Sequence, residues 1–173
     1  MSTKFKVDIS NADVQISEKD IVVKGKEGQL SLSLVYPFLK IERKENTLLI
    51  ESEKDNKFQK AIAGTLAAQI RNMIKGVNEN YTAELELVYM HFPASMKLNG
   101  NKLMVENFVG ERKPREITIL EGVKAEVKGN KIILSGTDKY KVGQMAGTIE
   151  SKIQIKKKDR RIFKDGIFIT KKP

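Results

Sequence analysis

The sequence contains one hairpin–helix pattern twice, and this repeat limits the folds that are open to the chain. Residues 46–50 (NTLLI) align with 130–134 (NKIIL) at an offset of 84, and residues 63–66 (AGTL) align with 146–149 (AGTI) at an offset of 83. One gap therefore superposes the two copies. Chance similarity is the alternative, since short local matches arise easily. A duplication predicts an α+β fold of two tandem modules, each a small, mainly antiparallel sheet packed against one helix.

The first copy begins with short strands. Val14–Ile16 and Ile21–Val23 flank a polar turn, and Leu30–Leu34 alternates with period two, which is typical of a strand with one buried face. Leu39–Arg43 and Leu48–Ile50 flank a further turn. The pattern predicts an antiparallel meander, because antiparallel sheets commonly bury one face and expose the other.

The period changes after these strands. Apolar residues from Phe58 to Ile74 recur every three or four positions, which predicts an amphipathic helix over residues 56–75. Asp55 or Asn56 is suited to cap its N-terminus, and Gly76 is expected to end it.

The second copy follows the same scheme. Strands are predicted at 84–90, 102–105 and 117–119, and Gly129-Asn130 predicts a hairpin between 123–127 and 131–134. A helix follows over 138–153, with Asp138 as its cap. The predicted modules span residues 1–82 and 83–173. A glycine at the same place in both helices, Gly64 and Gly147, predicts that each helix crosses its sheet closely there, since an interior glycine otherwise destabilises a helix.

Composition excludes several classes of protein. The 173 residues hold no cysteine, which removes disulfide frameworks, thiol nucleophiles and cysteine-based zinc sites. The first residues contain no apolar core of a secretory signal, and no apolar run approaches the ~20 residues that span a bilayer. We therefore expect an intracellular globular protein without membrane contact.

The positive charge is concentrated at one end of the chain. The net charge is +10, but residues 1–82 contribute +2 and residues 152–173 contribute +7, from nine bases and two acids. A concentrated basic segment is typical of a protein that binds a polyanion, most often nucleic acid. A solubilising tail is the alternative.

Catalytic motifs are sparse. His91 is the only histidine, and a packed or hydrogen-bonded structural role is the simpler interpretation; a hydrolase that pairs His91 with a carboxylate is the alternative. Gly25–Gly28 forms a G-x-x-G pattern of the kind that clamps nucleotides in KH domains, but the flanking strands favour a hairpin turn. We expect no enzymatic activity, no cofactor, no metal and no small-molecule substrate.

The segment 156–169 (KKKDRRIFKDGIFI) carries five bases within six positions. Closely spaced cations suit closely spaced phosphates, and the arginine pair can bind them in a bidentate manner. Phe163, Ile167 and Ile169 are expected to pin the segment to the protein body, and Asp165-Gly166 is expected to form a tight turn. Residues 112–115 (RKPR) offer a second cluster, or an ordinary polar loop.

Several stretches together resemble a known family. KDRRIFKDGIFI at 158–169 resembles the C-terminal signature of the large-ribosomal-subunit protein six family in its archaeal and eukaryotic branch, with an arginine pair closer to the archaeal form. IRNMIKGV at 70–77, VYMHFP at 88–93, ENFVGE at 106–111 and VGQ at 142–144 agree with the family and occur in its order.

The resemblance implies a ribosomal protein with two related α+β domains. Its expected partners are large-subunit rRNA, bound mainly through the C-terminal domain near the sarcin–ricin loop, together with neighbouring large-subunit proteins and the translational GTPases that dock nearby. The expected location is the cytoplasm, within the large ribosomal subunit. A non-ribosomal RNA-binding protein is the alternative. The predicted rRNA-binding residues are Lys156, Lys157, Lys158, Arg160, Arg161 and Lys164, with Arg112, Lys113 and Arg115 as a second group.

Overall fold

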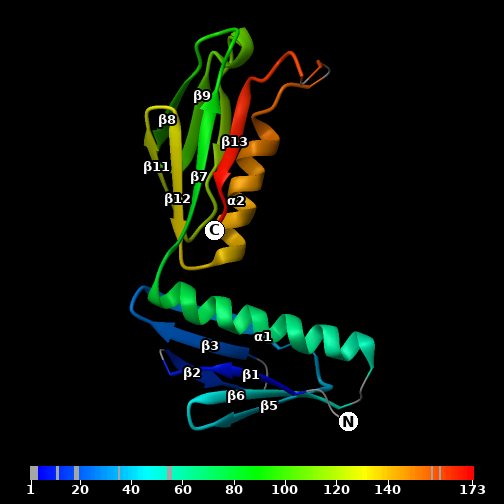
Figure 1. The fold of residues 1–173 in the computed structure, drawn as a ribbon. Helices are drawn as coiled ribbons and strands as arrows, with labels where there is room; N and C mark the ends of the chain where they lie inside the picture. The colour runs from blue at the N-terminus through cyan, green and yellow to red at the C-terminus, as the bar shows by residue number, and fades with distance from the viewer. Residues whose placement is uncertain are drawn as a thin grey trace. The chain divides into compact units, whose positions relative to one another are not determined.

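The computed structural model describes residues 4–10, 12–17, 20–34, 36–53, 56–156, 158–159 and 161–173. The chain divides into two compact units, Met1–Asn80 and Tyr81–Pro173, drawn at the blue-to-green and green-to-red parts of Figure 1. In the described part of the chain, neither helix is both long and apolar enough to cross a membrane.

The described part of unit 1 holds two three-stranded antiparallel sheets. One has the order β1-β6-β5 and the other the order β2-β3-β4. In β3 the buried residues alternate along the strand, and Ile21 and Val23 are fully enclosed. The bounds are β1 Lys4–Asp8, β2 Asp13–Ile16, β3 Asp20–Gly25, β4 Gly28–Ser33, β5 Leu39–Lys44 and β6 Thr47–Ser52.

Helix α1, Lys57–Asn78, packs its apolar stripe against both sheets. Asn56 caps it by accepting a hydrogen bond from the amide of Phe58, as predicted, whereas Asp55 lies outside the described residues. The prediction that Gly76 ends the helix is wrong. Gly76 is buried and helical, because the next residue, Val77, is fully enclosed in the core and continues the packed face.

The backbone of strand β3 approaches the end of α1 very closely. A Cβ atom at Gly25 would lie 2.5 Å from Cγ2 and 2.7 Å from the carbonyl oxygen of Val77. Only glycine fits this approach. The amide of Glu27 also donates to the Val77 carbonyl at 2.8 Å. Gly25 and Gly28 pair with each other and flank the β3–β4 hairpin turn, as the simpler interpretation of the G-x-x-G pattern predicted.

Unit 2 repeats this arrangement and extends it. A four-stranded sheet has the order β11-β12-β7-β13, and a three-stranded sheet has the order β10-β9-β8. Helix α2, Lys139–Lys152, begins at the predicted cap Asp138 and contacts all four strands of the larger sheet. The bounds are β7 Tyr81–Val88, β8 Ser95–Asn99, β9 Lys102–Glu106, β10 Arg115–Thr118, β11 Val123–Lys128, β12 Lys131–Gly136 and β13 Gly166–Lys171.

The topology of the two units confirms the duplicated α+β fold. In each unit the first strand pairs with the second strand of the hairpin that precedes the helix, so that β1-β6-β5 corresponds to β7-β12-β11. The three intervening strands form the second sheet in both units, as β2-β3-β4 and β8-β9-β10. Strand β13 has no counterpart in the described part of unit 1 and lies beside β7, as the red strand in Figure 1.

Candidate nucleic-acid interface

The basic segment, which we define as residues 156–164, connects α2 to β13 and is anchored at both ends. Ile153 and Ile155 are buried immediately before it. Ile167 is buried after it, and Phe163 and Ile169 pack against the same core, as predicted. The expected tight turn at Asp165-Gly166 is wrong, because Gly166 is already the first residue of β13.

The cations of the basic segment lie on the surface. Lys156, Lys158, Arg161 and Lys164 are exposed, whereas Lys157 and Arg160 lie outside the described residues. Apolar anchors on both sides therefore hold a short run of solvent-exposed positive charge at one end of unit 2. This arrangement differs from a freely moving tail, whose cations would lose more conformational entropy on binding.

An acidic residue shapes the middle of the basic segment. Asp159 accepts hydrogen bonds from the backbone amide of Arg161 at 2.9 Å and from its guanidinium at 3.0 Å. These bonds, the guanidinium bond first, hold the pKa of Asp159 below its usual 3.8. The amides of Ile162 and Phe163 donate to the Asp159 carbonyl and close a turn. The Arg161 side chain remains 90% exposed and directed to solvent.

The second cationic group lies in the loop before β10 and at the first residue of β10, and it contains two kinds of residue. Arg112 and Lys113 are exposed. Arg115 is half-buried: its Nε and Nη2 donate to the two carboxylate oxygens of Glu111 at 2.8 and 2.5 Å, and its guanidinium lies 4.5 Å from the centroid of the Phe108 ring. The bonds from Arg115 hold the pKa of Glu111 below its usual 4.5.

Arg115 also joins this loop to the end of α2, just before the basic segment. Its Nη1 donates to the carbonyl oxygens of Lys152 at 2.9 Å and Gln154 at 3.2 Å, where α2 ends. Four of the five guanidinium N–H donors are thus used within the protein. The structure thus ties the second group to the end of α2, which leads into the basic segment, and Arg115 is itself occupied by intramolecular bonds.

The turn that contains His91 is bound to the end of the basic segment. Asp165 is only 4% exposed and accepts from the amide of Met90 at 2.8 Å, the amide of His91 at 3.2 Å and Nδ1 of His91 at 2.7 Å. Burial alone would raise the pKa of Asp165, but these hydrogen bonds outweigh it and place the pKa below 3.8. Asp165 is therefore ionised at neutral pH, and Nδ1 of His91 carries a proton that it donates.

The ring of His91 supports the basic segment through an aromatic contact. It stacks on Phe163 with 4.6 Å between the ring centroids and an interplanar angle of 23°. The ammonium group of Lys158 lies 4.6 Å from the centroid of the same Phe163 ring. We call this row of four side chains, Asp165, His91, Phe163 and Lys158, the His91 stack. It runs from a buried carboxylate to an exposed cation.

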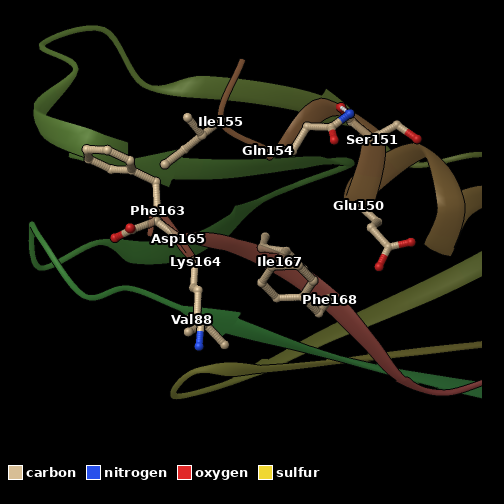
Figure 2. A pocket seen from close by; sticks show the side chains of 10 residues that line it. All are labelled: Val88, Glu150, Ser151, Gln154, Ile155, Phe163, Lys164, Asp165, Ile167 and Phe168. Atoms are coloured by element: carbon tan, nitrogen blue, oxygen red, sulfur yellow. Dashed lines mark hydrogen bonds between the residues drawn. The ribbon is translucent and has the colours of Figure 1, made fainter. Parts of the chain in front are cut away.

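A pocket of about 710 Å³ opens beside the basic segment, between the end of α2 and β13. Figure 2 shows Phe163, Lys164 and Asp165 on one side and Glu150 and Ser151 of α2 on the other. The carboxylate of Glu150 accepts from the amide of Ile169 at 3.3 Å and so joins α2 to β13. The basic segment therefore borders a concave surface as well as solvent.

Sequence reasoning identified the exposed cations but missed the contacts that hold them. The bond between His91 and Asp165 joins residues that are 74 positions apart. No local sequence pattern predicts a hydrogen bond between residues so far apart. The Glu111–Arg115 pair at i, i+4 is visible in the sequence, but the further bonds of Arg115 to the end of α2 are not.

Comparisons with known proteins give a consistent result. The sequence model of the family described as Ribosomal protein L6 matches residues 10–80 and 92–166, one block in each unit. The chain is 42% identical over 159 residues to the large ribosomal subunit protein uL6 of Methanosarcina mazei, which covers 92% of this chain and 90% of that protein. It is 42% identical to the uL6 protein of Methanothrix thermoacetophila over 92% and 91% of the two chains, and 39% identical to that of Methanococcus vannielii over 94% and 89%.

Proposed function

The chain belongs to the ribosomal protein L6 family, in its archaeal-like form, and from this premise we propose that it binds large-subunit rRNA through the exposed cations at one end of unit 2. Its family makes it a structural component of the large ribosomal subunit and not an enzyme. The hydrolase alternative for His91 is therefore set aside.

The observation that carries the proposal is the anchored, exposed basic segment. Buried Ile155 before it and buried Ile167 after it hold its ends in place, while Lys156, Lys158 and Lys164 are exposed. Cations held in a fixed layout suit a folded RNA, whose phosphates also have a fixed layout. Affinity then comes from charge neutralisation and counterion release, and selectivity comes from shape.

The predicted residues take different roles in this proposal. Lys156, Lys157, Lys158, Arg160, Arg161 and Lys164 contact phosphates, and Arg112 and Lys113 contact them from the neighbouring loop. Arg115 uses its guanidinium to hold that loop against the end of α2, so its contribution to binding is to position Arg112 and Lys113.

We also place the RNA site near the sarcin–ricin loop, where translational GTPases dock, and expect neighbouring large-subunit proteins as partners. This location is what the family resemblance implies. The low net charge of residues 1–82, +2, agrees with RNA contact mainly through unit 2.

The test measures binding to a large-subunit rRNA fragment that contains the sarcin–ricin loop. In a variant with Lys156, Lys157, Lys158, Arg160 and Arg161 changed to alanine, we expect a large loss of affinity. The wild-type plot of log affinity against log salt concentration should have a slope of roughly −4 to −5, for about five or six phosphates. The slope of the variant should be clearly shallower but not zero, because Lys164, Arg112 and Lys113 remain.

A matched control removes the same number of charges at the other end of unit 2, by changing Lys124, Lys139, Lys141, Lys171 and Lys172 to alanine; these lysines are also exposed. This control should keep most of the affinity and slope. If the two variants lose the same amount, net charge explains binding and the proposed site is wrong.

A second measurement separates a ribosomal protein from an RNA-binding protein that acts outside the ribosome. The tagged chain, expressed in its own cells, should co-sediment with large subunits through a gradient at high salt. Recovery only in light fractions with other RNAs would support the non-ribosomal alternative.

A further inference from the structure

We propose that His91 is a positioning residue for RNA binding: through Phe163 it holds the ammonium group of Lys158 where it meets a phosphate. The inference rests on the proposed function, because it assigns a role within the same interface. In the proposed function His91 itself contacts no phosphate.

The first step is the orientation of the imidazole. Three hydrogen bonds from the 90–91 turn converge on the carboxylate of Asp165, and one of them comes from Nδ1 of His91 at 2.7 Å. Because Asp165 is almost fully buried and is part of the chain that enters β13, this bond fixes the plane of the imidazole relative to the protein core. The remaining edge of the ring is free to face outward, since the His91 side chain is 34% exposed.

The second step is that the fixed imidazole holds the ring of Phe163 in place. The nearly parallel rings of His91 and Phe163, 4.6 Å apart, give the Phe163 side chain a rigid partner on one face. Phe163 is only half-buried and lies in the loop before β13. Without the imidazole it would lose a large part of its packing, because stacked aromatic pairs contribute beyond the area that they bury.

The third step is the placement of the cation. The Lys158 ammonium lies 4.6 Å from the Phe163 centroid, within the range of a cation–π interaction. A lysine side chain has four rotatable bonds and loses rotamer freedom when it binds a phosphate. Holding it over the ring before binding removes part of this loss, which corresponds to about a two- to tenfold gain in affinity for one side chain.

A double-mutant cycle with the rRNA fragment tests the inference. His91→Asn is the informative single variant, because the asparagine amide can still donate to Asp165 but offers no ring to Phe163. We expect His91→Asn to weaken binding about two- to tenfold without changing the slope against salt, because the number of phosphate contacts stays the same. In a Lys158→Ala background the same substitution should change affinity by less than about twofold.

Two further variants distinguish a positioning role of His91 from a role in general stability. Phe163→Leu should weaken binding by as much as His91→Asn. In the Lys158→Ala background it should also leave the affinity nearly unchanged. His91→Phe restores a ring beside Phe163 and should recover part of the affinity, although it loses the bond to Asp165. A role of His91 in general stability would instead make His91→Phe worse than His91→Asn.

The outcomes separate this inference from the proposed function. If Lys158→Ala leaves both affinity and salt slope unchanged, Lys158 contacts no phosphate and its place in the proposed site fails. If Lys158→Ala weakens binding but His91→Asn has the same effect in both backgrounds, the interface stands and the positioning role of His91 is overturned.

Discussion

Nδ1 of His91 lies 2.7 Å from Oδ2 of Asp165, across 74 positions of the sequence. The pair fastens the turn after β7 to the start of β13, the strand that unit 2 adds to the duplicated sheet. Two loops that are remote in the chain thereby form one surface, and the basic segment belongs to it.

The pair predicts a pH dependence of stability. The pKa of Asp165 is lower in the folded chain than its usual 3.8, so the folded state favours the ionised carboxylate. This contribution is fully present above pH 3.8 and is lost as the pH falls below it toward the folded pKa. Asp165→Asn should lower the free energy of unfolding by about 1–3 kcal/mol at pH 7, and the difference from wild type should shrink below about pH 4.

Urea unfolding followed by circular dichroism at a series of pH values measures this difference. Asp13→Asn, at an exposed position, is the control and should show little effect at any pH. A difference between wild type and Asp165→Asn that stays constant down to pH 2.5 would contradict the assignment.

Arg115 should be sensitive even to a conservative change. Its bonds to Glu111 and to the carbonyls of Lys152 and Gln154 need the branched guanidinium, which lysine cannot replace. Arg115→Lys should lower the free energy of unfolding by about 1–3 kcal/mol and speed amide exchange at the end of α2. Arg112→Lys, at an exposed position three residues earlier, should leave both quantities near wild type. Equal behaviour of the two variants would argue against the joining role of Arg115.

Gly64 and Gly147, which occupy corresponding positions in the two helices, should respond differently to alanine. A Cβ atom at Gly147 would meet no atom within 4 Å outside its helix, so the expectation that α2 crosses its sheet closely there is wrong. Gly147→Ala should therefore stabilise unit 2 by about 0.5–1 kcal/mol. At Gly64 a Cβ atom would lie 3.4 Å from the ring of Phe5, at the near limit of ordinary van der Waals contact, so Gly64→Ala should stabilise unit 1 by less. Chemical denaturation compares the two, and a larger gain at Gly64 would contradict this reading of the packing.

Ser52 presents a buried polar atom that should be dispensable. Its side chain is 1% exposed, and its hydroxyl oxygen has no hydrogen-bond partner among the described residues. Removing an unsatisfied hydroxyl relieves its desolvation, so Ser52→Ala should leave stability unchanged or raise it by up to about 1 kcal/mol. Ser33→Ala, at an exposed site, should be neutral. A marked loss of stability in Ser52→Ala would mean that the hydroxyl has a partner.

Much of the fold was predictable because its patterns are local. The amphipathic period of α1, the caps at Asn56 and Asp138 and the Gly129-Asn130 turn all act within a few residues, and the φ of +60° at Gly129 fits the turn that the sequence predicted. The sequence repeat likewise predicts the duplication.

The elements that were missed depend on distant partners. Strands β1, β8 and β13 are absent from the prediction, and β13 pairs with β7 from about 80 positions away. The prediction that the apolar residues of β13 anchor the basic segment is confirmed. The sequence does not predict that they form an edge strand, because that depends on β7 having an unpaired edge. In the same way, the sequence indicates that Lys158 is exposed but not that Phe163 lies beneath it.

Strand β13 has a consequence for what can vary in unit 2. In the described residues, β13 has no counterpart in unit 1, while the other strands of the two units follow the same order. The basic segment leads into β13 and so lies outside the strands that the two copies share. Substitutions of its exposed side chains can therefore alter ligand recognition without altering the core of the duplicated fold.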